Sequence, residues 1–284
     1  MHPMNEVKQS LVRVAILNEM GLGPVWAQRF PDVEVIESQP TQPQKLAPEL
    51  TGEPDIAPSS KSAIHHEDVV QTDSMPSHEV APIEIRADVP LVSSMGWAEL
   101  EATVSACQAC GLCKARQNTV FGVGERAATW LFVGEGPGYH EDLHGEPFIG
   151  AAGQLLDNML LAMGVKRGDR SYIANVVKCR AADEAGKDRP PSSDEIAACL
   201  PYLQRQIALI QPKVIVALGK TAAIALSGLD LDTPVAQLRG KVHQVGGIPM
   251  VATYHPAYLL RKPLEKSKAW QDLCLAQRAL DGRL

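Results

Sequence analysis

The sequence has no long hydrophobic run. No apolar stretch in its 284 residues reaches the roughly 18 residues that a membrane-spanning helix needs. The N-terminal residues MHPMNEVKQSLVR also lack the apolar core of a signal peptide. We therefore expect a cytoplasmic protein that does not engage a membrane, and nothing in the sequence requires more than a monomer.

Residues 31–95 lack any sustained hydrophobic period. They hold nine prolines, 12 acidic side chains and three basic ones, so this segment cannot bury enough apolar surface to offset the entropy of ordering it. It is predicted to be a disordered acidic linker. Residues 96–284 hold 19 acidic and 21 basic side chains, so the net charge of −6 does not exclude a nucleic-acid partner for that part.

Residues 1–30 form a short peptide ahead of the linker. Apolar residues between 7 and 16 fall near helical spacing, and Gly21 is a helix stop, which predicts a short helix. One interpretation is a marginal helix that docks on its own domain or has no role. The other is a docking peptide at 7–29 for a replication or repair protein, anchored by Trp26. The stretch MGLGPVW resembles the N-terminal peptide by which psi, a bacterial clamp-loader subunit, joins its complex.

In residues 96–284, apolar strand candidates alternate with helical stretches. Buried strands separated by helices indicate a parallel sheet with helices on both faces, and hence a three-layer αβα domain around four parallel strands. Ligands of such sheets bind at the carboxyl ends of the strands, where Gly134, Asn175, Gly219 and His255 occur. The predicted strands are TWLFVG (129–134), YIANVV (172–177), KVIVALG (213–219) and PMVATY (249–254), and the predicted helices are 153–163, 193–209 and 220–227.

Five of the six cysteines are grouped in a way that suggests metal binding. Cys107, Cys110 and Cys113 lie in CQACGLC, and Cys179 and Cys199 flank one later loop. Disulfides are not expected in a cytosolic protein of this size. A CxxC motif joined by two later cysteines brings four thiolates to one [4Fe–4S] cluster or one zinc ion. Spacing alone leaves both open, together with buried thiols that bind no metal.

The stretch LFVGEGPGYHEDLHGEPFIGAAGQLL, residues 131–156, runs from a strand through a glycine-rich turn into a helix. It lacks the G-x-G-x-x-G fingerprint of dinucleotide-binding proteins, because position 139 is Tyr. Three carboxylates between the turn and the helix would repel a pyrophosphate, and no Walker lysine follows. The glycines must therefore serve a different, close-fitting ligand.

Several separated motifs resemble those of one family. CQAC, GEGPGYHEDLHGEPFIGAAGQLL, NVVKCR, KVIVALG, RGKVH and YHPAYLLR occur in this order, and together they resemble the family-4 uracil-DNA glycosylases, the iron–sulfur branch of that superfamily. The resemblance implies the superfamily's αβα fold and release of uracil from single- or double-stranded DNA in base excision repair. It also implies a [4Fe–4S] cluster of mainly structural role, held by Cys107, Cys110, Cys179 and Cys199.

Base release explains the glycine-rich turn. A uracil cannot be reached within stacked duplex, so the nucleotide must be flipped into a pocket. Gly134, Gly136 and Gly138 would let backbone N–H groups approach the base and sugar. Phe148 is expected to stack on the base, and the alternative for it is a core aromatic.

Two polar residues are expected to select uracil. Asn175 offers an acceptor and a donor that match uracil N3–H and O4, whereas cytosine presents the reverse pattern. A structural Asn at a strand end is the alternative. By resemblance, Glu141 occupies the place of the tyrosine that excludes the thymine methyl group in family-1 enzymes.

Three residues are expected to carry catalysis. By resemblance, His255 donates to uracil O2, where negative charge develops. Gly136 stands where family-1 enzymes have their catalytic Asp, so Glu135 is the nearest carboxylate to stabilise the sugar cation or orient water. Asp188 stands where relatives carry an Asn and could act as a base.

The segment HPAYLLRKPLEKSK is predicted to contact DNA. Bulky side chains can fill the hole left by a flipped base while cations hold phosphates. The alternative is an ordinary loop with solvated lysines, and the alternative for the whole protein is a non-catalytic iron–sulfur or zinc DNA-binding module. The residues predicted to contact DNA are Tyr258, Leu259, Leu260 and Arg261.

Overall fold

The computed structural model describes residues 92–229 and 232–283. The peptide predicted at 1–30 and the linker predicted at 31–95, except for its last four residues, lie outside the described residues. Within the described ranges, no helix is both long and apolar enough to cross a membrane.

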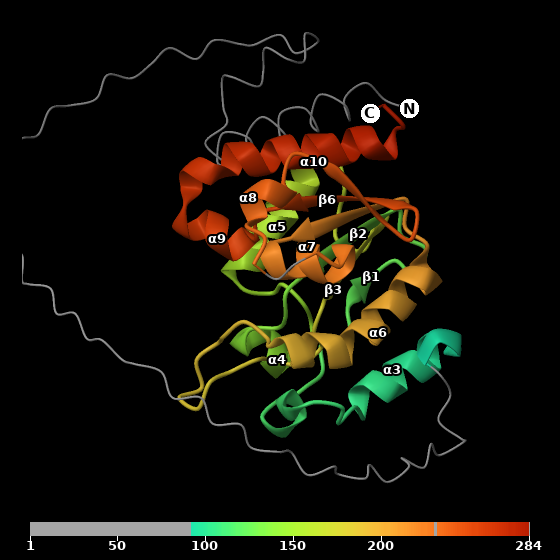
Figure 1. The fold of residues 1–284 in the computed structure, drawn as a ribbon, viewed down its shortest axis with the longest axis vertical. Coiled ribbons are helices and arrows are strands. Elements are labelled where there is room, and N and C mark those ends of the chain that lie inside the picture. Colours follow the sequence, from blue (N-terminus) through green and yellow to red (C-terminus); the bar gives the residue numbers. More distant parts are fainter. Residues whose placement is uncertain (1–91, 230–231, 284) are drawn as a thin grey trace, which may run out of the picture. The chain divides into compact units, whose positions relative to one another are not determined.

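A six-stranded sheet forms the centre of the domain, with the strand order β1-β3-β2-β4-β6-β5 (Figure 1). The strands are β1 Val123–Gly124, β2 Trp130–Gly134, β3 Ser171–Asn175, β4 Val214–Leu218, β5 Val242–Val245 and β6 Ile248–Thr253. The four central strands, β3, β2, β4 and β6, are parallel to one another, and each corresponds to one predicted apolar run. The four predicted parallel strands are present, but the sheet has six strands, because β1 and β5 add antiparallel edges. The sequence pattern misses them because β1 has two residues and no residue of β5 is fully buried.

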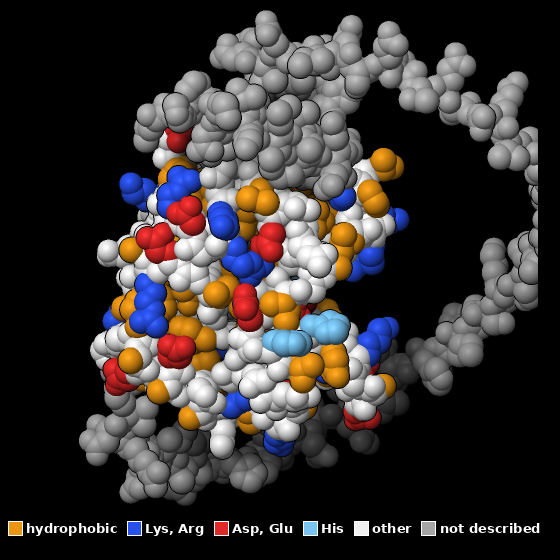
Figure 2. All heavy atoms as spheres, turned by 180° about the vertical axis from the view of Figure 1, so that it is seen from behind, with side chains coloured by type: hydrophobic (Ala, Val, Ile, Leu, Met, Phe, Trp, Pro, Cys, Tyr) orange, Lys and Arg blue, Asp and Glu red, His pale blue; other side chains and the backbone are white. Residues whose placement is uncertain are grey.

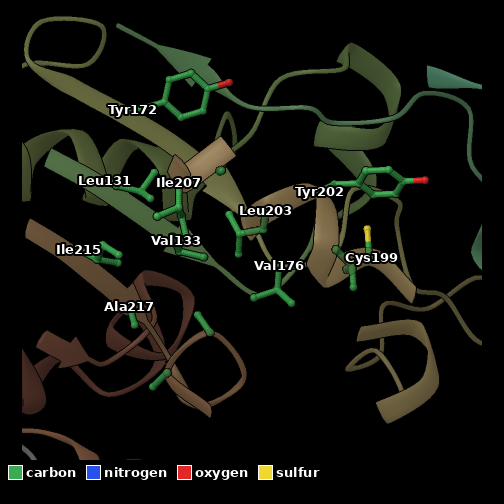
Figure 3. Packing of buried hydrophobic residues seen from close by; sticks show 14 of the residues in the cluster. Leu131, Val133, Tyr172, Val176, Cys199, Tyr202, Leu203, Ile207, Ile215 and Ala217 are labelled. Atoms are coloured by element: carbon green, nitrogen blue, oxygen red, sulfur yellow. The ribbon is translucent and has the colours of Figure 1, made fainter. Parts of the chain in front are cut away.

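Helices cover both faces of the sheet (Figure 1). Alternate residues along the buried strands point to opposite faces, so Leu131 and Val133 join one hydrophobic cluster while Trp130 and Phe132 join the other. Figure 3 shows Leu203 and Ile207, which lie on one helix, packed against the sheet face that carries Leu131 and Val133. The helices are α3 Trp97–Ser105, α4 Tyr139–His144, α5 Ala151–Ala162, α6 Ser193–Ile210, α7 Lys220–Ser227, α8 Val235–Leu238, α9 Pro256–Arg261 and α10 Lys266–Leu280, with short 3-10 turns η1 Val92–Ser94, η2 Gly111–Lys114 and η3 Pro263–Glu265.

The loop before α6 is closed by a capping box. The Ser192 hydroxyl accepts the Glu195 N–H, and the Glu195 carboxylate accepts the Ser192 N–H at 2.8 Å. Arg189 binds the same carboxylate with both of its terminal nitrogens at 2.7 and 2.8 Å. Hydrogen bonding to Arg189 lowers the pKa of Glu195 to about 2. These contacts anchor the loop that connects Cys179 with α6.

Candidate active site and cysteine cavity

A cleft of about 660 Å³ lies at the carboxyl ends of the parallel strands. Its walls include Glu135 after β2, Asn175 at the end of β3, Gly219 after β4 and His255 after β6. Figure 2 shows the molecule hollowed on one side, with basic and histidine side chains beside the hollow. The topology therefore brings together the residues that the sequence placed at separate strand ends.

Gly134 makes room for two pocket side chains. A Cβ atom at this position would lie 2.5 Å from Phe148 Cζ and would also collide with Asn175 Oδ1. Similarly, a Cβ atom at Gly136 would lie 2.7 Å from Val177 Cγ2. In this structure the first glycine thus serves the approach of Phe148 and Asn175 to the strand end.

Phe148 lies on the pocket wall in a left-handed backbone conformation with φ 56°. Such a conformation is costly for a bulky residue and is found mainly where function requires it. Arg167 holds it by donating to the carbonyl oxygens of Pro147 and Phe148 at 3.0 and 2.8 Å. At Gly153 any Cβ atom would collide with the Phe148 carbonyl. Sequence reasoning missed Arg167 and Gly153, because their role depends on a contact with the Phe148 backbone.

The Phe148 ring stacks beside His255, with ring centroids 5.5 Å apart and an angle of 28° between the rings. Asn175, which lines the same cleft, is 1% exposed, and its Oδ1 has no hydrogen-bond partner among the described residues. A buried polar atom without a partner costs roughly 1–3 kcal/mol. The arrangement therefore fits a flat ligand that donates a hydrogen bond to Asn175.

His255 is the N-cap of α9, and this position determines its tautomer. Nδ1 accepts the Ala257 N–H at 3.2 Å, so the proton of the neutral imidazole lies on Nε2. Burial, with a smaller contribution from the Arg261 charge, lowers the pKa of His255 from its ordinary 6.5 to about 4, while Glu141 opposes the shift. At neutral pH, His255 is therefore an uncharged donor of one N–H.

We expect a ¹⁵N NMR titration to find His255 as the Nε2–H tautomer with a pKa near 4. Since the folded protein binds this proton more weakly than the unfolded chain, the corresponding stability is complete above about pH 6.5 and is lost as the pH falls towards 4. The difference amounts to about 3 kcal/mol. The His255→Asn variant assigns the signal and should lack this acid-dependent loss; an ordinary pKa for His255 would contradict the burial argument.

Glu135 and Asp188 place two carboxylates in the cleft wall. The Thr221 hydroxyl donates to Glu135 Oε2 and so restricts the orientation of that carboxylate. Asp188 Oδ1 accepts from Arg180 Nε at 2.6 Å, and its side chain is 53% exposed. Glu135 is thus held in place in the cleft wall, while Asp188 lies paired and near solvent.

The Glu141 carboxylate organises the glycine-rich turn. Its Oε2 accepts the Gly138 N–H at 3.2 Å, and its Oε1 accepts the N–H groups of Ile149 and Gly150 at 3.1 and 3.4 Å. These contacts tie the start of α4 to the segment before α5, while Glu141 also lines the cleft. The Gly138 N–H, predicted to face a ligand, therefore already has an acceptor.

The predicted DNA segment is divided between core and surface. Leu259 is completely buried among the residues that pack with α5, so it cannot contact DNA, and its prediction was wrong. Tyr258 is partly buried against Tyr254, with ring centroids 4.9 Å apart. Leu260 is 43% exposed, and Leu264 of the same segment is 92% exposed.

Five cysteines line one small cavity between η2, the residues after β3 and α6: Cys107, Cys110, Cys113, Cys179 and Cys199. Donors surround three of their sulfur atoms. Tyr202 Oη donates to Cys107 Sγ at 3.3 Å, Arg116 Nη1 to Cys179 Sγ at 3.3 Å, and the Lys178 N–H to Cys199 Sγ at 3.2 Å. Hydrogen bonds of this kind support thiolates that bind a metal centre.

Burial raises the pKa of Cys199 to about 11 and also raises that of Cys179 above its ordinary value. Without a metal centre, both thiols are therefore protonated at neutral pH and weak as nucleophiles. Binding of a metal centre would have to displace these protons. The donor set fits a thiolate-bound centre better than a catalytic cysteine.

Comparisons with known proteins identify the family of this chain. Residues 121–274 match the sequence model described as Uracil DNA glycosylase superfamily, which is the class of protein that the parallel sheet and its cleft define. The chain is 44% identical to the type-4 uracil-DNA glycosylase of Archaeoglobus fulgidus over 166 residues, covering 56% of this chain and 81% of that protein. It is 42% identical to that of Pyrobaculum aerophilum over 183 residues (62% and 91%) and 44% identical to that of Thermotoga maritima over 160 residues (56% and 80%). The chain therefore belongs to the type-4 uracil-DNA glycosylases.

Proposed function

We propose that this protein removes uracil from DNA by hydrolysing the bond between the base and its sugar, which leaves an abasic site for base excision repair. The buried, unpartnered Oδ1 of Asn175 carries this proposal. It lines a cleft with the Phe148 and His255 rings, as recognition of a flipped base requires. The type-4 relatives bear the name of this activity.

Uracil is read on its face and on its edge. The Phe148 ring stacks on the base, and the Asn175 side chain pairs with N3–H and O4. Cytosine has an acceptor at N3 and a donor at N4, so it would leave this buried amide mismatched. Glu141 closes the side of the pocket at C5, where thymine carries its methyl group.

Heterolysis of the bond leaves negative charge on uracil O2 and positive charge on the sugar. The Nε2–H of His255 stabilises the anion, and since the imidazole is neutral, this is a hydrogen bond rather than a proton transfer. Glu135 stabilises the sugar cation and orients water, with its carboxylate held by Thr221. Asp188, which lies near solvent, acts as a base on the attacking water.

DNA is held beside α9. The exposed side chains of Leu260 and Leu264 fill the hole that a flipped nucleotide leaves, and Arg261 contacts a phosphate. Tyr258 supports this surface from the cleft side. Both single- and double-stranded DNA are proposed substrates.

We propose a [4Fe–4S] cluster in the cysteine cavity, with Cys107, Cys110, Cys179 and Cys199 as ligands. A zinc ion requires its donors about 2.0–2.3 Å from one point, and among residues 92–229 and 232–283 no three Cys, His, Asp or Glu side chains are arranged to hold a single ion. Five thiols around one cavity instead offer enough donors for a multi-iron cluster. When bound, the cluster would link η2 to α6.

We expect Cys199→Ala to abolish the visible charge-transfer absorbance and to lower the iron content severalfold, because one of four ligands is removed. The matched control is Cys113→Ala, which changes a cysteine of the same cavity that the proposal leaves spare. Iron and sulfide assays measure both variants. Equal loss of iron in the two variants would contradict the ligand assignment.

Base release tests the proposed activity. Labelled oligonucleotides with U:G, U:A, T:G or single-stranded U are incubated with the protein, and alkali reveals abasic sites. Cleavage at uracil and not at thymine is the expected result. A protein that keeps its cluster and binds DNA but releases no base would instead be a non-catalytic DNA-binding module.

The role of the N-terminal peptide stays a prediction. Docking of a replication or repair protein through residues 7–29 lies outside the described residues. A monomeric state and a cytoplasmic location are likewise proposed.

A further inference from the structure

Lys178 is a buried lysine between the cysteine cavity and the uracil pocket. Its side chain is 1% exposed, and the residue lines the cysteine cavity. Nζ donates to the Asn175 backbone oxygen at 2.8 Å and to Gln206 Oε1 at 2.6 Å. Both acceptors are neutral, whereas a buried ammonium ion is costly unless an anion lies nearby. The thiolates of a loaded cavity would supply that negative charge.

Helix α6 holds Lys178 at both of its ends. The backbone N–H of Lys178 donates to Cys199 Sγ at 3.2 Å, while its Nζ donates to Gln206. Cys199 and Gln206 both lie in α6, seven residues and thus about two turns apart, so they share one face of the helix. Gln206 is itself fixed, because its Nε2 donates to the Phe121 oxygen at 2.9 Å.

These contacts connect the cysteine cavity to the uracil pocket through a short stretch of chain. Asn175 ends β3, and Cys179 follows four residues later. The Lys178 ammonium closes this short turn by returning to the Asn175 carbonyl. A shift of α6 at Cys199 would therefore move the residue whose side chain reads uracil.

We propose that Lys178 is a positioning residue, which couples the cysteine cavity to uracil recognition by holding Asn175 in its reading orientation. Lys178 acts through Asn175 and does not touch the base. This inference rests on the proposed function, since it assigns a support to the residue that reads uracil. It also gives the cluster a second effect besides linking chain segments.

The test is Lys178→Met, which keeps the length of the side chain and removes its donors. We expect the variant to keep its cluster, measured by iron content and visible absorbance. The Kd for uracil-containing DNA and the KM for uracil release should rise roughly tenfold, since the hydrogen bond from the ammonium group to the Asn175 oxygen is lost. The preference for uracil over cytosine should fall by a similar factor. Lys213→Met, at an exposed lysine before β4, is the matched control.

Unchanged KM and unchanged preference for uracil in a loaded Lys178→Met protein would overturn the inference. So would a loss of activity that follows cluster loss alone, with the preference for uracil intact. If Lys178→Met does not fold, Gln206→Met is used, because it removes one acceptor of Nζ and should shift KM and base preference in the same direction. Absence of uracil release by the wild type would instead refute the proposed function.

Discussion

Replacing Asn175 by alanine should slow uracil release at least 100-fold. The substitution removes the two hydrogen bonds expected to the uracil edge, each worth roughly 1–3 kcal/mol in a buried site. The cleft itself should survive, because the side chain is small and its Oδ1 has no partner among the described residues. Initial rates on single-stranded uracil oligonucleotides measure the effect.

The matched control for this variant is Asn158→Ala, which changes an asparagine of α5 outside the cleft wall. It should release uracil at the wild-type rate. Thermal unfolding of both variants shows whether the fold is kept. Uracil release by Asn175→Ala within fivefold of wild type would refute the role of Asn175 in reading the base.

Replacing His255 should lower kcat roughly 10²–10³-fold while KM changes little. The reason is that its N–H acts on charge that develops only in the transition state, and loss of such a donor typically has this effect. Alanine would also remove the acceptor for the Ala257 N–H at the start of α9. The more informative variant is therefore His255→Asn, because asparagine caps helices well and cannot place an N–H where the imidazole has one.

Single-turnover rates separate the chemical step from DNA binding in His255→Asn. We expect wild-type DNA affinity together with the slow chemical step. A slow step that accelerates below pH 6.5 in the wild type would point to protonated imidazole as the active form. That outcome would contradict the neutral His255 inferred from its low pKa.

The sequence patterns identified the parallel centre of the fold because its strands are buried on both faces. Continuous apolar runs such as those of β2 and β4 mark such strands without help from long-range contacts. The edge strands β1 and β5 carry no comparable pattern. Their pairing depends on neighbours far away in the chain.

Among the candidate site residues, local motifs were enough to place those at strand ends in one cleft. Asn175 and His255 follow buried runs, and parallel topology brings such ends to one edge of the sheet. Leu259 shows the limit of this reasoning. In the sequence it resembles its neighbour Leu260, and only the rotation of α9 against α5 buries one and exposes the other.

The same distinction applies to the cysteines and to Lys178. Spacing showed that thiols were grouped, but it left zinc, a cluster and plain buried thiols open. Folding brings η2 against α6 and so forms one cavity from distant cysteines. Lysine is ordinarily a surface residue, and nothing in NVVKCR reveals that Lys178 turns inward to Asn175 and Gln206. Burial and hydrogen-bond partners are properties of tertiary packing, whereas strand and motif order are already present in the chain.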